Sequence, residues 1–264
     1  MTTRDTAFAA GTPCWIDLFS ADPAKAKEFY GAVFGWTAQD SGEEFGGYVT
    51  FFSDGQQVAG MMQNPEESGT PDLWSTYISS DDIDATVAAA TAAGAQVVAP
   101  AMAVSDLGSM AVLIDPAGGA FGIWQPGKHT GFNKYNEPNS VTWDEYHSKD
   151  FATTKDFYAQ VFDWTYDATS DTDEFRYYNA QINGETVAGM MDSAGFLPAE
   201  VPSHWAVYFS VEDTDAAMAK VVQAGGSMIR SPEDTPFGRI ADVADPTGAL
   251  FKLHSMKMAE SAGS

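Results

Sequence analysis

The chain has 264 residues, of which 44% are hydrophobic and 13% aromatic, a composition that excludes a disordered protein and predicts two globular domains. Its 13 basic and 37 acidic residues give a net charge of −24, which argues against nucleic acid and anionic membranes as partners. The single cysteine excludes an internal disulfide, and no apolar run resembles a signal peptide or is long enough to span a bilayer. We therefore expect a cytoplasmic monomer or homodimer.

The first half is predicted to contain two successive units with the order strand, helix, strand, strand, strand. After a strand at residues 15–19, Asp22-Pro23 begins a helix, because aspartate is a favoured N-cap and proline suits the first helical position. Three strands complete the first unit, at 36–39, 48–52 and 57–62. The second unit has a strand at 74–79, a helix at 82–93, and strands at 96–99, 109–114 and 120–124.

The second half repeats the first. Trp15-Ile-Asp17 returns 128 residues later as Trp143-Asp-Glu145, and the run 58–62 (Val-Ala-Gly-Met-Met) returns 129 residues later at 187–191. Such self-similarity is typical of a duplicated domain. We predict domains at 1–126 and 140–264, a linker at 127–139, and units at about 12–63, 73–126, 140–192 and 203–256.

One tetrapeptide stands before the last strand of each half. It reads Asp-Pro-Ala-Gly at 115–118 and Asp-Pro-Thr-Gly at 245–248. Aspartate, proline and glycine at the first, second and fourth positions are typical of a type I turn, so we interpret both as structural.

Together, the paired units, the helix that carries Phe-Tyr and then Phe-Gly-Trp, and the Asp-Pro-x-Gly turns resemble the vicinal oxygen chelate superfamily. This is the fold of glyoxalases, bleomycin-resistance proteins and extradiol dioxygenases, and the chain is most similar to tandem-domain actinobacterial hydroxylase- or glyoxalase-like proteins. The resemblance covers about residues 12–126 and 140–256. It implies an α+β fold of four βαβββ modules, paired into two half-open β-barrel domains with the helices outside.

The resemblance also implies a divalent metal in enzymatic members, held by His or Gln on the first strand of a module and Glu on its last strand. In this chain those positions hold Trp15, Ser75, Trp143, Ala206, Gly122 and Lys252. Because a hard divalent metal needs several carboxylate, imidazole or carbonyl ligands, we expect no metal or other cofactor. The alternative is an irregular divalent metal site formed by Glu145, His147 and His254.

Each half is predicted to form an aromatic-lined cup with one inward carboxylate, because strand residues two apart share a face. Trp15 and Asp17 face the first cup, and Trp143, Glu145 and His147 face the second. The other expected lining residues are Tyr77, Trp124, Tyr208 and Lys252. We expect buried polar pairs between Asp17 and Tyr77 and between Glu145 and Tyr208 or Lys252. His129, in the linker, is expected to face solvent.

Three functions remain open. The first is the binding of a small organic molecule, aromatic or cationic, in the cups without a metal. The second is a lyase, isomerase or hydroxylase-type enzyme that acts on a small carbonyl or phenolic substrate, with Asp17 or Glu145 as the base or with the irregular metal site. The third is an interaction protein whose cups are filled by Trp15 and Trp143.

Overall fold

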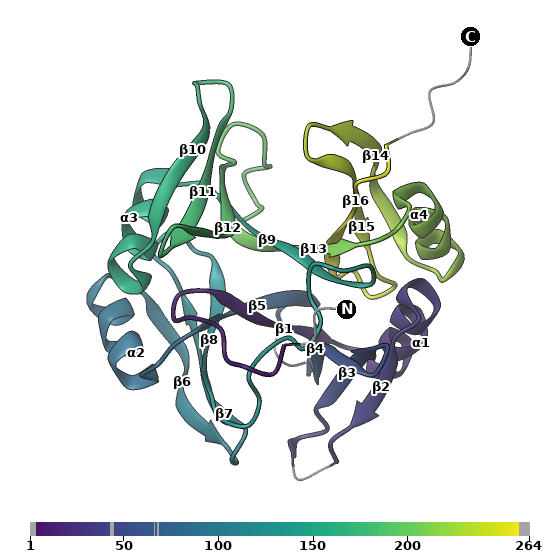
Figure 1. Ribbon diagram of the computed structural model, residues 1–264, viewed down its shortest axis with the longest axis horizontal. Coiled ribbons are helices and arrows are strands. Elements are labelled where there is room, and N and C mark those ends of the chain that lie inside the picture. Colours follow the sequence, from purple (N-terminus) through teal and green to yellow (C-terminus); the bar gives the residue numbers. More distant parts are fainter. Residues whose placement is uncertain (1–3, 43–44, 66, 68, 259–264) are drawn as a thin grey trace.

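Each half of the chain folds into one eight-stranded mixed sheet in the computed structural model, which describes residues 4–42, 45–65, 67 and 69–258 (Figure 1). The first half consists of β1 (Pro13–Ser20), α1 (Pro23–Phe34), β2 (Thr37–Asp40), β3 (Val49–Ser53), β4 (Gln56–Gln63), β5 (Leu73–Ser79), α2 (Ile83–Ala92), β6 (Gln96–Val104), β7 (Gly108–Ile114) and β8 (Ala120–Pro126). The second consists of β9 (Ser140–Ser148), α3 (Phe151–Phe162), β10 (Thr165–Asp171), β11 (Arg176–Ile182), β12 (Glu185–Asp192), β13 (His204–Ser210), α4 (Thr214–Gln223), β14 (Ser227–Thr235), β15 (Gly238–Ala244) and β16 (Leu250–Ser255).

The two sheets have the same topology, which confirms four βαβββ modules. Their strand orders are β2-β3-β4-β1-β5-β8-β7-β6 and β10-β11-β12-β9-β13-β16-β15-β14. In each sheet the first strands of the two modules run antiparallel at the centre, and each pairs in parallel with the last strand of its own module. Because the first strands run antiparallel, residues near the start of one lie beside residues near the end of the other, as Trp15 lies beside Tyr77 and Trp143 beside Tyr208.

The first helix of each half is capped as the sequence predicts. The Asp22 side chain accepts a hydrogen bond from the backbone of Lys25, and the Asp150 side chain accepts one from Thr153. Both helices end in a left-handed residue, which is Gly35 in α1 and an aspartate, at φ 57°, in α3. No helix in the described ranges is long and apolar enough to cross a membrane.

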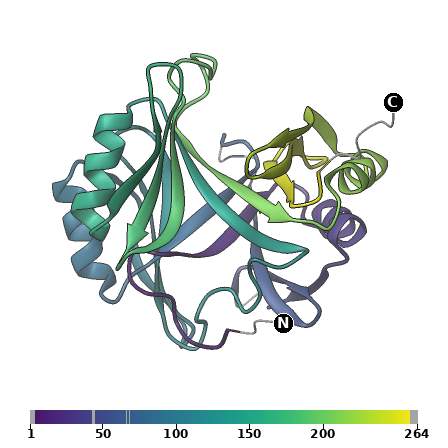
Figure 2. The same cartoon turned by 45° about the horizontal axis from the view of Figure 1, so that its top comes forward.

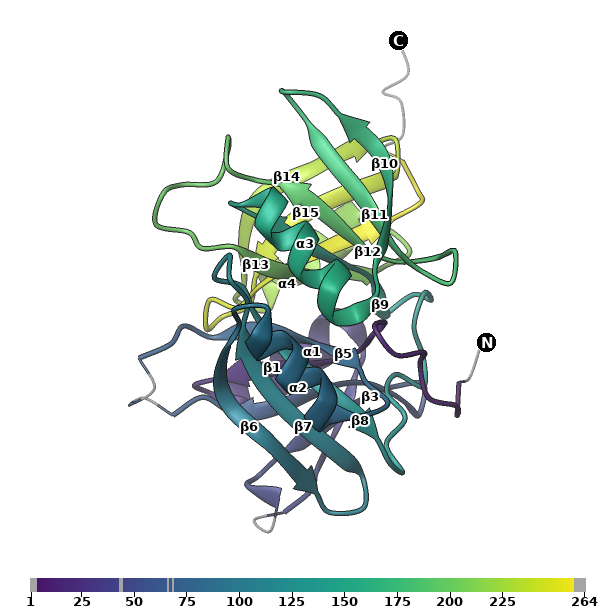
Figure 3. The same cartoon turned by 90° about the vertical axis from the view of Figure 1, so that its left-hand side faces the viewer.

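The helices pair across the two halves. Helix α1 lies beside α4, and α2 lies beside α3 (Figures 1 and 2). Viewed from the side of α2 and α3, the first-half sheet lies below and the second-half sheet above (Figure 3). One continuous core reaches from Phe29 and Phe34 of α1 to Phe209 and Phe251 of the other half.

A chain of three side chains locks α1 to the second half. Trp74 Nε1 donates to the Tyr30 hydroxyl over 3.0 Å, and this hydroxyl donates to Asp245 Oδ2 over 3.1 Å. The other Asp245 oxygen accepts the backbone N–H groups of residues 247 and 249, as a turn-forming aspartate does. The Asp-Pro-x-Gly aspartate therefore both forms its turn and contacts the other domain.

The duplication repeats this lock. Trp205 Nε1 donates to the Tyr158 hydroxyl over 3.1 Å, which donates to Asp115 Oδ2 over 3.1 Å. We call the two sets of three residues the interdomain locks.

The segment 127–139, predicted as a linker, packs against the first half. The backbone N–H of Phe132 donates to the Cys14 carbonyl over 2.9 Å. The buried Lys134 ammonium donates to Ser53 Oγ and pairs with Asp54 at 2.8 Å. These contacts hold the segment over one end of the first-half sheet.

Candidate functional site

A cluster of aromatic side chains surrounds Asp17 in the first half. Asp17 Oδ1 accepts hydrogen bonds from the Tyr48 hydroxyl over 2.7 Å and from Trp15 Nε1 over 3.0 Å. Tyr77, the expected partner of Asp17, lies across from Trp15 in the sheet. Within the described part of the chain, its buried hydroxyl has no hydrogen bond of normal geometry. We call these four residues the first-half cluster.

Burial sets the protonation of Asp17. Desolvation raises its pKa to about 6, although hydrogen bonds from Tyr48 and Trp15 oppose the rise. Asp17 therefore titrates close to physiological pH, and its carboxyl group is enclosed by aromatic rings.

The linker covers this cluster, contrary to the expectation that His129 faces solvent. The His129 ring centroid lies 4.3 Å from that of Trp15 and 5.2 Å from that of Trp124. Trp124 Nε1 also donates to the His129 carbonyl over 2.9 Å. Burial lowers the pKa of His129 to about 4, so the ring is neutral at physiological pH. The expected ligand-binding residue Trp124 thus packs against the linker.

The second half carries the same framework with charged groups added. We call its residues the second-half cluster: Trp143, Glu145, His147, Tyr177, His204, Tyr208 and Lys252. Glu145 Oε1 accepts a hydrogen bond from the Tyr208 hydroxyl over 2.7 Å and lies 2.8 Å from His147 Nε2. The expected pairing of Glu145 with Tyr208 is therefore present in the structure.

Glu145 and Asp17 occupy matching positions, but their pKa values shift in opposite directions. Burial alone would raise the pKa of Glu145, but the contact and charge of His147, with smaller effects of Lys252 and Tyr208, lower it to about 2. Glu145 is consequently ionised across the physiological range. Because Tyr208 and His147 already engage it, it is a poor anchor for a cationic ligand.

Two histidines stack at one end of the second-half cluster. His147 and His204 face each other across β9 and β13, with ring centroids 5.0 Å apart and planes inclined by 10°. The other nitrogen of His147, Nδ1, lies 3.3 Å from Ser193 Oγ. Burial, and then the charge of His147, lowers the pKa of His204.

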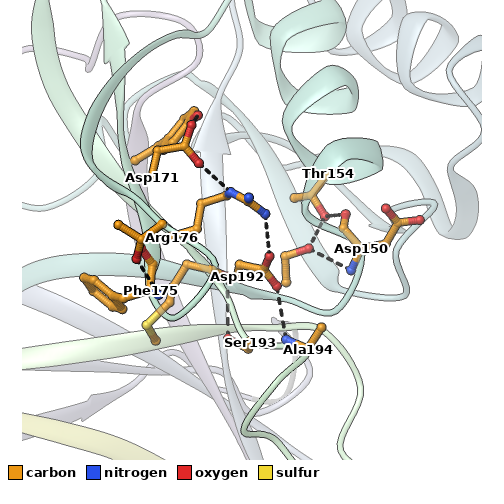
Figure 4. Close-up of polar contacts among 12 residues, drawn as sticks. Asp150, Thr154, Asp171, Phe175, Arg176, Asp192, Ser193 and Ala194 are labelled. Carbon is orange, nitrogen blue, oxygen red and sulfur yellow. Dashed lines mark hydrogen bonds and ion pairs between the residues drawn. The ribbon is translucent and has the colours of Figure 1, made fainter.

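A turn after β12 fixes Ser193 beside His147. Its backbone N–H donates to the Ser148 carbonyl over 2.6 Å. The preceding Asp192 accepts the Ala194 N–H and pairs with Arg176 at 3.0 Å (Figure 4). Arg176 in turn binds a second aspartate, Asp171, at 2.7 Å (Figure 4). This ion-pair network holds the turn, and with it the serine, on the cluster.

Lys252 does not pair with Glu145 as the sequence suggested. Its ammonium lies 3.4 Å from Asp242 Oδ1 and 5.0 Å from the centre of the Tyr208 ring. Asp242 lies directly across from Lys252 on the neighbouring antiparallel strand, which makes it the nearer carboxylate. Lys252 therefore acts on Glu145 through its charge at longer range.

Sequence reasoning missed Tyr48 and Tyr177. Trp143 Nε1 donates to the Tyr177 hydroxyl over 3.0 Å, just as Trp15 Nε1 donates to Tyr48. Both hydroxyls approach a glycine of the repeated Val-Ala-Gly-Met-Met strand, where a Cβ atom would lie about 2 Å away, at 1.8 and 2.1 Å. The sequence could have indicated both tyrosines, because Tyr177 follows Tyr48 by 129 residues, the same offset that separates the two Val-Ala-Gly-Met-Met strands.

The irregular metal site is not assembled. Pairing of β13 with β9 places Glu145 beside Ala206, whereas pairing with β16 places His254 beside Ser210, four residues further along β13. His254 Nε2 instead lies 2.7 Å from the Phe237 carbonyl. Within the described ranges, no three His, Cys, Asp or Glu side chains are grouped so that they could hold a metal.

The family's usual metal position does not fit a divalent ion in this chain. Trp15 and Trp143, the residues at that position on the first strands, donate hydrogen bonds through their indole nitrogens and offer no lone pair to a metal. The residues opposite these tryptophans in the sheet are tyrosines, and beside the tyrosines the last strands supply a glycine and a lysine.

Comparisons with known proteins agree with this fold. The chain is 36% identical over 251 residues to the Mycobacterium tuberculosis protein named "Putative glyoxylase CFP32", covering 93% of this chain and 95% of that protein. It is 37% identical over 270 residues to the anthracycline biosynthesis protein DnrV of Streptomyces peucetius, covering 96% of both chains. Among solved structures, the Mn(II)-bound glyoxalase from Novosphingobium aromaticivorans aligns with a TM-score of 0.65 at 15% identity, covering 94% of this chain and 82% of that one.

The model of the family described as Glyoxalase/Bleomycin resistance protein/Dioxygenase superfamily matches twice, at residues 13–121 and 145–253. These two matches correspond to the two eight-stranded sheets. The chain therefore belongs to the glyoxalase/bleomycin resistance protein/dioxygenase superfamily.

Proposed function

We propose that the protein binds a small, planar aromatic molecule at its second-half cluster and uses the first half as a structural counterpart. The observation that carries this proposal is the asymmetry of two clusters with one framework. The linker covers the first cluster, whereas Trp143, Tyr177, His204 and Lys252 of the second are only partly buried. Partly exposed aromatic rings around a fixed polar centre are typical of small-molecule sites.

The chemistry of the second-half cluster favours an aromatic compound with hydroxyl or carbonyl groups over a cation. Trp143 and Tyr177 offer ring surfaces, and Lys252 and His204 offer polar groups at their margin. Glu145 is engaged by its neighbours, which leaves a cationic ligand without a free counter-ion. A hydroxylated polycyclic ketone also suits the likeness to DnrV, whose name refers to anthracycline biosynthesis.

The test is calorimetric titration with an anthracycline aglycone, which is neutral and polycyclic, and with the parent compound that carries an amino sugar. We expect the aglycone to bind at least as tightly as the cationic parent. Trp143→Ala should weaken binding by about tenfold or more, since a lost aromatic contact costs about 1.5 kcal/mol or more with its buried area.

The control is Trp15→Phe, which keeps an aromatic ring in the covered first-half cluster and should leave the affinity within about twofold. Loss of binding in Trp15→Phe but not in Trp143→Ala would place the site in the first half and contradict the proposal. Binding of the amino-sugar compound alone would favour a cation site instead.

A further inference from the structure

The stacked histidines belong to the second half alone. In the duplicated framework, the first-half counterparts of His147 and His204 are Phe19 and Leu73, which pair with each other across β1 and β5 as the histidines do across β9 and β13. A fold that accepts Phe and Leu at these positions does not require imidazoles there. Their presence beside Glu145 therefore calls for a chemical explanation.

The tautomer of His204 is fixed by its surroundings. Its Nδ1 lies 3.0 Å from the Pro202 carbonyl oxygen, which can only accept, so Nδ1 carries the proton. In the neutral ring the lone pair is then on Nε2. Burial and the neighbouring positive charges of His147 and Lys252 lower the pKa of His204, which keeps the ring neutral at pH 7. A half-buried neutral imidazole with this tautomer is built to accept a proton.

The carboxylates that the sequence suggested as bases are less suitable. Glu145 has a pKa of about 2 and is engaged by Tyr208 and His147, so it accepts protons weakly. Asp17 lies in the first-half cluster, which the linker covers. His204 is thus a partly exposed group whose ring is neutral at pH 7 and whose Nε2 lone pair is available for general-base chemistry.

We propose that His204 is a catalytic base, which removes a proton from a hydroxyl or from the carbon next to a carbonyl of the bound aromatic compound. The O–H or C–H bond breaks, the proton forms a new N–H bond at Nε2, and the electron pair remains on the substrate as a phenolate or enolate. The positive charge of Lys252, on the same cluster, stabilises this anion. Return of the proton to a different atom of the enolate completes an isomerisation, which needs no oxidant or reductant.

This inference rests on the proposed function, and one probe separates the two. The probe is an anthracycline aglycone with a methyl ketone side chain, incubated in D2O with the full-length protein. Calorimetry measures its binding, and mass spectrometry measures deuterium uptake at the carbon next to the ketone. We expect bound aglycone to exchange faster than in buffer, and His204→Gln to lower the protein-catalysed rate about 100-fold or more.

The matched control is His129→Gln, because His129 is also a buried neutral histidine but lies in the linker over the other cluster. It should leave both binding and exchange unchanged, whereas His204→Gln, which keeps a polar side chain in the second-half cluster, should lower the exchange rate far more than the affinity. Binding without accelerated exchange, or exchange that survives His204→Gln, would overturn the base assignment and leave the proposed function intact. Absence of binding in the original protein would overturn the proposed function itself.

Discussion

At the scale of single residues, duplication has produced two carboxyls at matching positions whose pKa values shift in opposite directions. Asp17 and Glu145 each accept a tyrosine hydroxyl over 2.7 Å beside a tryptophan. Of the two, Glu145 alone has a histidine at 2.8 Å, and this histidine, together with Lys252 and Tyr208, outweighs the effect of burial on its pKa. The neighbouring side chains therefore decide whether the pKa of a buried acid in this framework is raised or lowered.

This difference predicts opposite effects of pH on two matched variants. Asp17 has a folded pKa of about 6, above the value of 3.8 for a free side chain, so stability falls as pH rises from about 4 to 6. Asp17→Asn removes this loss. Between these pH values, its free energy of unfolding should therefore rise by roughly 2–3 kcal/mol relative to that of the original protein.

Glu145→Gln should behave in the reverse way. The folded pKa of Glu145, about 2, lies below the ordinary 4.5, so its contribution is present above pH 4.5 and is lost as pH falls towards 2. The variant should therefore be destabilised at pH 6 and less so at pH 3. Urea unfolding of both variants across pH 3–7 checks the pair, and parallel pH curves would contradict it.

At the scale of elements, α1 and α3 end in the same backbone conformation but at different residue types. Both helices stop at a residue in the left-handed conformation, which glycine adopts freely. Asp163 of α3 adopts it at φ 57° and also places a negative charge at the negative end of the helix dipole.

Asp163→Gly should therefore raise the free energy of unfolding by about 1 kcal/mol. Asp163→Asn isolates the charge effect, since it removes the charge and keeps the side chain, and it should provide only part of the gain. Urea denaturation measures both. A destabilised glycine variant would show that a contact of the Asp163 side chain stabilises the protein by more than the strain of its left-handed backbone costs.

The elements also show what local sequence can and cannot predict. Caps, alternation and the 128-residue repeat predicted the modules, because each depends on residues near one another or on a constant offset. The pairing of α1 with α4 was not predictable, because Tyr30 and Asp245 are 215 residues apart. Each residue also fits its own helix or turn, so nothing in the local sequence indicates the distant contact. The acidity of Glu145 was missed for the same reason, because it depends on distances that no periodicity encodes.

At the scale of the whole molecule, the interdomain locks predict that both halves unfold together. Tyr30→Phe keeps the ring but leaves Trp74 Nε1 and an oxygen of Asp245 without their partner. We expect it to lower the free energy of unfolding by about 1–3 kcal/mol. Tyr158→Phe should do the same from the other half.

Each variant should shift one common transition, followed in parallel by tryptophan fluorescence and far-UV circular dichroism. The control is Tyr166→Phe, whose hydroxyl bonds the Lys155 carbonyl within one half and should cost less. Two separated transitions in Tyr30→Phe would show that the halves are independent in stability.

The cross-paired helices also bear on how such a molecule can evolve. The α1–α4 and α2–α3 contacts are related by the duplication, as the two contacts of a symmetric dimer are related by its axis. In a dimer of identical subunits, any mutation appears in both binding regions at once. Covalent fusion removes that constraint and makes assembly independent of concentration. One half can then remain a scaffold while the other acquires histidines. The helix contacts between the halves keep them assembled and so allow their two clusters to differ.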